Sequence, residues 1–79
     1  MKYACPCCGY KTLTHQPPGT FLICRVCFWE DDPVQYKNPS YRGGANKMSL
    51  TEAQESFRLI GAIDRESLGH VRRPLPDEK

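Results

Sequence analysis

Four cysteines in two Cys-x-x-Cys pairs constrain this chain more than any other feature of its sequence. Cys5 and Cys8 form the first pair, Cys24 and Cys27 form the second, and fifteen residues separate the two pairs. Two cysteines three positions apart on a tight turn can direct both sulfurs toward one ion, and two such turns supply four ligands in a tetrahedron. The spacing therefore predicts that these four cysteines bind one metal ion.

The residues of the first pair favour such a turn. Pro6 follows Cys5 and presets the backbone φ angle, while Gly9 follows Cys8 and can adopt the positive φ that the turn needs. The second pair lies in the sequence Cys-Arg-Val-Cys-Phe, which contains neither proline nor glycine. We therefore expect the second turn to be less constrained than the first.

Zinc is the metal that we expect at this site. Tetrahedral sites made only of sulfur hold zinc or iron, so a rubredoxin-like iron site is the alternative. A closed shell of four sulfurs leaves no position for water or substrate, whereas catalytic zinc keeps one position open. We therefore predict one structural Zn²⁺ per chain, whose binding energy stabilises the fold, and neither catalytic residues nor enzyme activity.

The other candidate ligands are Cys7, His15 and His70. We interpret Cys7 as the variable residue of the first turn, pointing away from the metal; the alternatives are a substitute ligand or an oxidation-sensitive thiol. With four cysteines available, we expect both histidines in loops or on the surface. A thioredoxin-like redox pair is disfavoured because the residues after Cys8 predict a strand rather than a helix.

The size of the chain supports a stabilising metal. The chain has 79 residues, 39% of them hydrophobic, and contains seven prolines and six glycines. A chain of this length buries little apolar surface, so its core alone gives marginal stability. We expect a single cysteine-rich zinc-binding domain over residues 1–79.

Apolar stretches are short throughout the chain. The longest, Phe21–Cys24, has four residues, whereas a membrane span needs about 20 apolar residues and the apolar part of a signal peptide about 7 to 15. We therefore expect a cytoplasmic protein with no membrane partner. In that reducing compartment, closely spaced cysteines are more often metal ligands than disulfides.

Two stretches rich in β-branched and aromatic residues, 10–14 and 20–24, lie between the cysteine pairs and are separated by His-Gln-Pro-Pro-Gly. This pattern predicts an antiparallel hairpin that places two zinc knuckles side by side, as in a zinc ribbon. A third short strand is expected at 28–30. The expected architecture is a small metal-bound α+β fold, with a zinc ribbon at 1–32, a long loop at 33–47 and a C-terminal α-helix.

The clearest helical pattern begins at Ser49. Ser49 and Glu52 form the Ser-x-x-Glu pattern of a capping box, and Gly61 is suited to end the helix. Four apolar residues recur at helical spacing and predict one buried face: Leu50, Ala53, Phe57 and Ile60. We expect residues 48–79 to form a helical extension packed on the ribbon, ending in a polar tail at 77–79.

Several stretches of the chain resemble the bacterial cysteine-rich CPCC family: YACPCCGY, ICRVCFWEDD, GGANKMSLTEAQESF, GAIDRES and VRRP. The resemblance extends over about residues 3–74 and implies a zinc-ribbon-like metal site on the same four cysteines. Arg25 departs from the family, which often has proline after the third cysteine; this leaves the ligands intact but makes the second turn less rigid. The resemblance implies no known activity, and some family members resemble accessory or immunity-type proteins encoded near toxin genes.

Charge and the closed metal shell together favour a function in protein–protein interaction. The formal net charge is +2 with neutral thiols, and four thiolates with one Zn²⁺ bring it to about zero, which disfavours nonspecific nucleic-acid binding. We expect a noncatalytic zinc module that binds another protein. The alternative is a regulatory zinc ribbon that binds nucleic acid through Arg25, Lys37, Arg42 and Lys47. A third possibility is a thiol redox sensor at Cys7.

Overall fold

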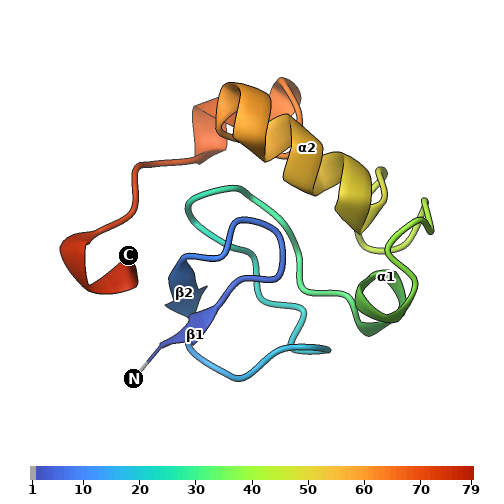
Figure 1. The fold of residues 1–79 in the computed structure, drawn as a ribbon, viewed down its shortest axis with the longest axis horizontal. Coiled ribbons are helices and arrows are strands. Elements are labelled where there is room, and N and C mark those ends of the chain that lie inside the picture. Colours follow the sequence, from blue (N-terminus) through green and yellow to red (C-terminus); the bar gives the residue numbers. More distant parts are fainter. Residues whose placement is uncertain (1) are drawn as a thin grey trace.

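The computed structural model describes residues 2–79, most of which lie in turns and loops around short regular elements (Figure 1). In chain order, these elements are β1 (Tyr3–Ala4), β2 (Lys11–Leu13), α1 (Pro33–Lys37), α2 (Leu50–Ile60) and the 3₁₀ helices η1 (Glu66–His70) and η2 (Pro76–Glu78). The C-terminal segment returns to the side of the molecule where the N-terminus lies (Figure 1). Over residues 2–79, no helix has both the length and the apolar character that crossing a bilayer requires.

Each cysteine pair lies in the connection of its own small antiparallel pairing. The first pair lies between β1 and β2, which are antiparallel with Tyr3 opposite Leu13 and an irregularity in the register. The second pair lies between Ile23 and Glu30, which form an isolated antiparallel bridge. The two cysteine turns are thus formed by residues that are close in sequence, and the fold is a small α+β fold with one two-stranded sheet in the described residues.

The predicted hairpin between 10–14 and 20–24 is wrong. Residues 11–13 do form a strand, but the partner of this strand is β1. Residues 20–24 contribute only the bridge at Ile23 to regular pairing, and the third strand expected at 28–30 is reduced to Glu30 in the same bridge. The cysteine turns therefore do not lie at the open end of one shared hairpin.

Asp31 explains why residues 20–22 do not pair with β2. Its Oδ2 atom accepts hydrogen bonds from the backbone N–H and the hydroxyl of Thr20, at 2.9 and 2.7 Å. The backbone of Asp31 accepts from Phe21 N and donates to Leu22 O, both at 2.9 Å. Three of these four bonds use backbone groups that a strand pairing would need, and together the four hold residues 20–22 against Asp31.

The short helix α1 occupies the first five residues of the segment predicted as a loop, so that prediction is wrong for Pro33–Lys37. Asp32 caps the helix, because its Oδ1 atom accepts from Val34 N at 2.7 Å and Gln35 N at 3.2 Å. Proline at the first helical position is favourable, since its missing N–H would have no partner there. The Asp-Pro sequence was thus a start signal for a helix that the sequence interpretation did not use.

The loop after α1 is ordered by one buried amide, that of Gln35. Its Nε2 donates to the backbone carbonyls of Tyr41, Asn46 and Met48, at 3.1, 3.1 and 2.8 Å. Its Oε1 accepts from the backbone N–H and the side-chain Nδ2 of Asn46, at 3.1 and 2.9 Å. Asn46 in turn exchanges two hydrogen bonds with the backbone of Glu30. The loop is therefore fixed to α1 and to Glu30, which lies after the second cysteine turn.

The backbone of Gly44 lies tightly against the side chains of Asp32 and Gln35. A Cβ atom at this position would lie 2.6 Å from Asp32 Oδ2 and 2.9 Å from Gln35 Cδ. The next residue, Ala45, donates its backbone N–H to the same Asp32 oxygen at 2.8 Å. Only glycine therefore allows the backbone to reach the Asp32 carboxylate without displacing its neighbours.

The helix predicted from Ser49 is confirmed. Ser49 and Glu52 form a reciprocal capping box, and Gly61 ends the helix in the left-handed region with φ 85°. Leu50 and Ala53 are buried, and the partly buried Phe57 packs against the same core. Ile60, expected on the buried face, is exposed instead, because it lies in the last turn, beyond the part of the helix that packs on the core.

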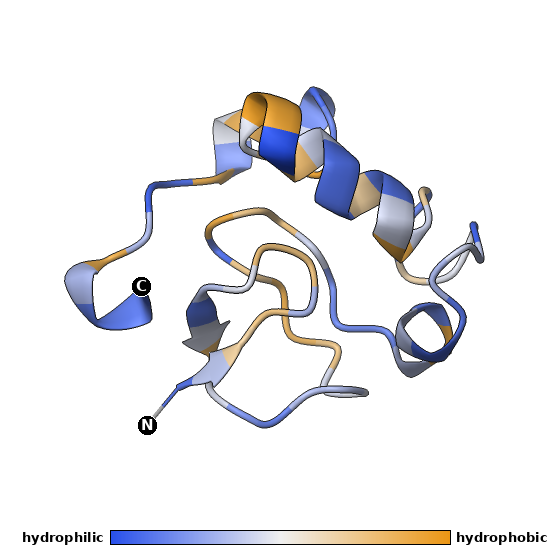
Figure 2. Cartoon of the chain, viewed as in Figure 1, coloured by the Kyte–Doolittle hydropathy of each residue, from blue (hydrophilic) through white to orange (hydrophobic). Residues whose placement is uncertain are grey.

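The hydrophobic core is centred on the cysteine turns. It contains Trp29, Val26, Leu50, Ala53 and Ile63 together with buried cysteines. Figure 2 shows apolar colouring along the central turns and at the end of α2, with hydrophilic colouring over α1 and the C-terminal tail. Trp29, only 1% exposed, is the largest fully buried side chain. A metal at the cysteines would therefore lie inside the core and connect its parts.

The prediction of a polar tail at 77–79 is wrong for Glu78. This residue lies in η2 and is 1% exposed, although the chain ends one residue later. Before it, the chain forms η1, where Asp64 Oδ1 accepts from Ser67 N at 2.8 Å. The C-terminal segment is therefore an ordered part of the fold.

Candidate metal centre

The structure brings Cys5, Cys8, Cys24 and Cys27 together. Their sulfur atoms all lie within 4.8 Å of one another. Two contacts join the turns, because Cys5 Sγ lies 3.7 Å from Cys27 Sγ, and Cys8 Sγ lies 3.6 Å from Cys24 Sγ. Three of the residues are buried and Cys8 is half-buried. The four sulfurs are thus positioned to bind one metal ion.

The sulfur separations fit a tetrahedral thiolate site. A Zn–S distance of about 2.3 Å corresponds to about 3.8 Å between sulfurs at the corners of a tetrahedron. Two of the sulfur separations between the turns are 3.6 and 3.7 Å. Soft sulfur donors favour zinc or iron over magnesium and calcium, which prefer oxygen. The donor set and its size therefore suit a four-thiolate metal.

The two cysteine turns have the same backbone hydrogen bonds. In the first turn, Cys5 N donates to Tyr10 O and Gly9 N donates to Cys5 O, both at 2.9 Å. In the second turn, the same bonds run from Cys24 N to Trp29 O at 2.9 Å and from Phe28 N to Cys24 O at 2.8 Å. The missing proline and glycine have therefore not changed the conformation of the second turn.

Phe28 occupies the place that Gly9 has in the first turn. Gly9 has φ 81° and Phe28 has φ 77°, a region that costs a non-glycine residue about 1–2 kcal/mol. The Phe28 ring stacks on His70, with ring centroids 5.1 Å apart and an angle of 20° between the planes. The ring also packs against the core. These contacts offset the backbone cost. We expected the second turn to be less constrained than the first, but packing of the Phe28 side chain fixes it.

Backbone N–H groups face the sulfurs in both turns. Cys7 N lies 3.4 Å from Cys5 Sγ, and Val26 N lies 3.4 Å from Cys24 Sγ. Trp29 N lies at the same distance from Cys27 Sγ. Such donors stabilise a negative charge on sulfur. Cys7 and Val26 are thus equivalent residues of the two turns, and each contributes its backbone to the site.

Thr12 is a residue of the site that the sequence interpretation missed. Its hydroxyl donates to Cys24 Sγ at 3.0 Å. Thr12 lies in the middle of β2, where the alternation of side chains directs one face of the strand toward the second turn. No spacing in the sequence indicates this contact, because it depends on how the two turns pack together.

The four thiols interact too closely to ionise independently. Hydrogen bonding with Cys24 is the main cause that raises the pKa of Cys5, Cys8 and Cys27. The pKa of Cys24 is lowered, chiefly by its hydrogen bond with Cys27, with further contributions from Cys5 and Cys8. Four thiolates this close together require a cation among them.

The remaining candidate ligands lie outside the four-sulfur group. Cys7 is buried, but its thiol is not among the four sulfurs that approach one another. His15 is exposed and contacts the Thr14 hydroxyl at 3.2 Å through Nδ1. His70 is exposed and stacks on Phe28. In residues 2–79, neither histidine belongs to a cluster that could hold a metal ion.

The C-terminal half of the chain is bonded to both cysteine turns. Gln54 Nε2 in α2 donates to Pro6 O at 3.0 Å. Ile63 N, just after α2, donates to Cys27 O at 3.0 Å. Tyr10, after the first turn, meets Phe57 of α2 edge-on with ring centroids 6.2 Å apart. The helix therefore covers the cysteine turns and excludes water from one side of the site.

Comparison with known proteins agrees with these features. A search of curated proteins found no match. A family model described as cysteine-rich CPCC matches residues 3–78, which include both cysteine turns, α2 and most of the C-terminal segment. A match over nearly the whole length shows common descent rather than a shared motif. The chain belongs to the cysteine-rich CPCC family.

Proposed function

We propose that this protein is a noncatalytic module in which one structural zinc ion stabilises the fold and which acts by binding another protein. The observation that carries the proposal is the group of four cysteine sulfurs, all within 4.8 Å of one another, at the centre of the core. Zinc bound there would join two turns from different parts of the chain. Its binding energy would then become part of the folding energy.

The composition of the proposed shell supports a noncatalytic role. When all four positions around zinc are sulfurs, no position remains for a water molecule or a substrate. His15 and Thr14 are in contact, but both are exposed and the described residues offer no third group that orients the histidine. His70 is engaged with Phe28. These arrangements lack the aligned nucleophile, base and orienting group of known hydrolases.

An exposed apolar surface supports a protein partner. Phe21 is 53% exposed and Ile23 is 44% exposed. Together with Leu13, Leu22 and Phe28 they line a groove of about 460 Å³ beside the second cysteine turn. Exposed apolar side chains next to a concave surface are typical of sites that bind proteins. We propose that this groove contacts the partner.

The basic residues of the nucleic-acid alternative are partly neutralised. Arg42 forms a bidentate ion pair with Glu52, and Lys47 forms an ion pair with Glu66. Arg25 and Lys37 have no carboxylate within ion-pair distance among residues 2–79. A phosphate backbone would have to compete for two of the four cations, so protein binding is the better supported function.

A salt titration with a partner capture tests this proposal. We expect zinc-loaded protein to show no binding to duplex DNA or single-stranded RNA at micromolar concentrations between 50 and 200 mM salt, roughly the range in which phosphate contacts become evident. We expect tagged protein to capture a cellular protein in a fixed ratio. The Phe21→Ser variant should no longer capture this partner but should still contain one zinc per chain. Micromolar nucleic-acid affinity with a steep salt slope would contradict the proposal.

A further inference from the structure

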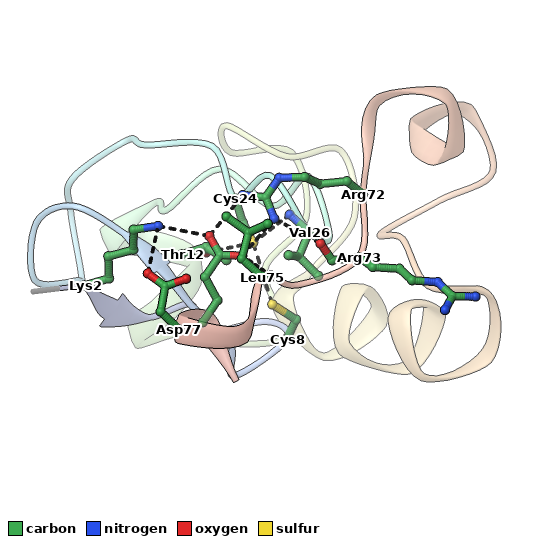
Figure 3. Close-up of polar contacts among 10 residues, drawn as sticks. Lys2, Cys8, Thr12, Cys24, Val26, Arg72, Arg73, Leu75 and Asp77 are labelled. Carbon is green, nitrogen blue, oxygen red and sulfur yellow. Dashed lines mark hydrogen bonds and ion pairs between the residues drawn. The ribbon is translucent and has the colours of Figure 1, made fainter.

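The carboxylate of Glu78 is buried and fully paired near the end of the chain. Arg72 donates to it through Nη1 at 2.7 Å and Nη2 at 3.0 Å. Lys2 Nζ donates at 3.2 Å, and the backbone N–H of Leu75 donates at 2.8 Å. Lys2 Nζ also lies 3.7 Å from Asp77 Oδ2, and Figure 3 shows Lys2 and Asp77 on one side of this group of side chains and Arg72 on the other. Both carboxylate oxygens are thus satisfied by donors from three residues: Lys2, Arg72 and Leu75.

This ion-pair arrangement joins Lys2 to residues 72–78. Hydrogen bonding to Arg72 is the main cause that lowers the pKa of Glu78 to about 2, so the carboxylate is charged at neutral pH. A buried charge is costly unless it is paired, and here two cations and a backbone donor pair it. The arrangement fixes residues 72–78 against the N-terminal strand.

The same segment contacts the metal centre on two sides of Cys24. Arg72 N donates to Arg25 O at 3.1 Å, at the residue directly after Cys24. At its other end, η2 packs on β2, whose Thr12 donates to Cys24 Sγ. Cys24 has no exposed surface. The segment therefore packs on the two elements next to Cys24, the second cysteine turn at Arg25 and the strand that carries Thr12.

We propose that residues 72–78 form a clasp over the metal centre, locked by the buried carboxylate of Glu78, and that the clasp limits the rate at which zinc leaves. This inference rests on the proposed structural zinc. Glu78 is a positioning residue, because it acts on the site through Arg72 and η2 rather than by touching the metal. Cys8 is half-buried, so a chelator can approach the site from that side. Complete release also requires Cys24 to give up the metal, and Cys24 is fully buried, so this step waits for the clasp to open.

Zinc release to a coloured chelator, measured at several chelator concentrations, tests the clasp. For the wild-type protein, we expect a slow release whose rate does not depend on chelator concentration, because opening limits it. For Glu78→Gln, we expect release about ten-fold faster, comparable to the loss caused by removing groups that orient metal ligands. The rate should also rise with chelator concentration, because an open clasp lets the chelator attack the bound metal directly.

Two matched measurements separate the clasp from general stability. Glu66→Gln removes an exposed carboxylate from an ion pair with Lys47 and should leave the release rate unchanged. Cobalt-loaded Glu78→Gln should keep the thiolate-to-cobalt absorption of the wild-type protein, since all four sulfurs remain. If Glu78→Gln does not fold, Arg72→Lys replaces it, because this variant keeps the charge but loses the two-point contact.

The outcomes distinguish the clasp from the proposed metal. Wild-type protein that folds without bound metal would overturn the proposed function itself. Zinc-loaded protein with equal release rates in the wild type, Glu78→Gln and Glu66→Gln would overturn the clasp alone. Faster zinc release from Glu78→Gln at a rate that stays independent of chelator concentration would also overturn the clasp, because residues 72–78 would then only add stability to the fold. Faster, chelator-dependent release from Glu78→Gln or Arg72→Lys supports the clasp.

Discussion

Replacing Cys27 by serine is expected to abolish both zinc binding and the native fold. Cys27 is fully buried, and its sulfur contacts Cys5 across the two turns. Structural zinc contributes about 10–16 kcal/mol to the folding of small metal-bound domains, which is comparable to the about 5–15 kcal/mol by which a whole domain is stable. We expect purified Cys27→Ser to contain far less than one zinc per chain by elemental analysis and to lack native circular dichroism.

Cys7→Val is the matched control for this variant. The equivalent residue in the second turn is valine, Val26, and both residues direct their backbone N–H toward a cysteine sulfur. We expect Cys7→Val to keep one zinc per chain and a cooperative unfolding transition. A folded Cys27→Ser protein, or a Cys7→Val protein without zinc, would contradict the assignment of the ligands.

Replacing Gln35 by leucine is the second change for which we expect a large effect. The leucine has a similar size but leaves three carbonyls and the two Asn46 donors without the partners they have now. Each buried polar group that loses its partner costs about 1–3 kcal/mol. Since some of these groups would reach water through the loosened loop, we expect a loss of about 3–5 kcal/mol of unfolding free energy, measured by urea denaturation of zinc-loaded protein.

Gln54→Leu makes the same chemical change at an exposed residue. Gln54 donates one hydrogen bond, to Pro6 O, so we expect a loss below about 1.5 kcal/mol. In Gln35→Leu, amide hydrogen exchange should become faster over residues 38–48 while the cysteine turns stay protected. Equal losses of stability in the two variants would show that the Gln35 network does not order this loop.

Features encoded by neighbouring residues were predicted well from the sequence. The capping box at Ser49 and the stop at Gly61 depend on contacts within a few residues, and both are present. The approach of the four cysteines follows from a spacing typical of metal sites. Such features are determined by local backbone geometry and by the chemistry of the donor atoms, both of which can be inferred from residue types.

Strand pairing could not be predicted because two arrangements suit the same residues. The stretch 20–24 has a composition typical of strands. However, its backbone N–H groups at Thr20 and Phe21 and its carbonyl at Leu22 are hydrogen-bonded to the buried Asp31. Phe28 shows a related difficulty, since its positive φ is normally found at glycine and is stabilised here by stacking on His70. In both cases, a tertiary contact overrides a local preference.

Contacts between distant residues were also outside the reach of the sequence interpretation. The carboxylate of Glu78 pairs with Lys2, 76 positions earlier in the chain, and the three C-terminal residues alone suggested a solvated tail. Thr12 reaches Cys24 only because the turns pack against each other. Neither contact has a spacing that a pattern could detect, so both had to come from the three-dimensional structure.

X-ray absorption at the zinc edge tests the central claim, that one zinc ion is held by four sulfurs, most directly. The claim predicts a first shell of four sulfur atoms at about 2.3 Å and no lighter ligand, in protein that contains about one zinc per chain. A nitrogen or oxygen atom in that shell would show an open position or a different ligand set. That result, or a fully folded protein without metal, would contradict the claim.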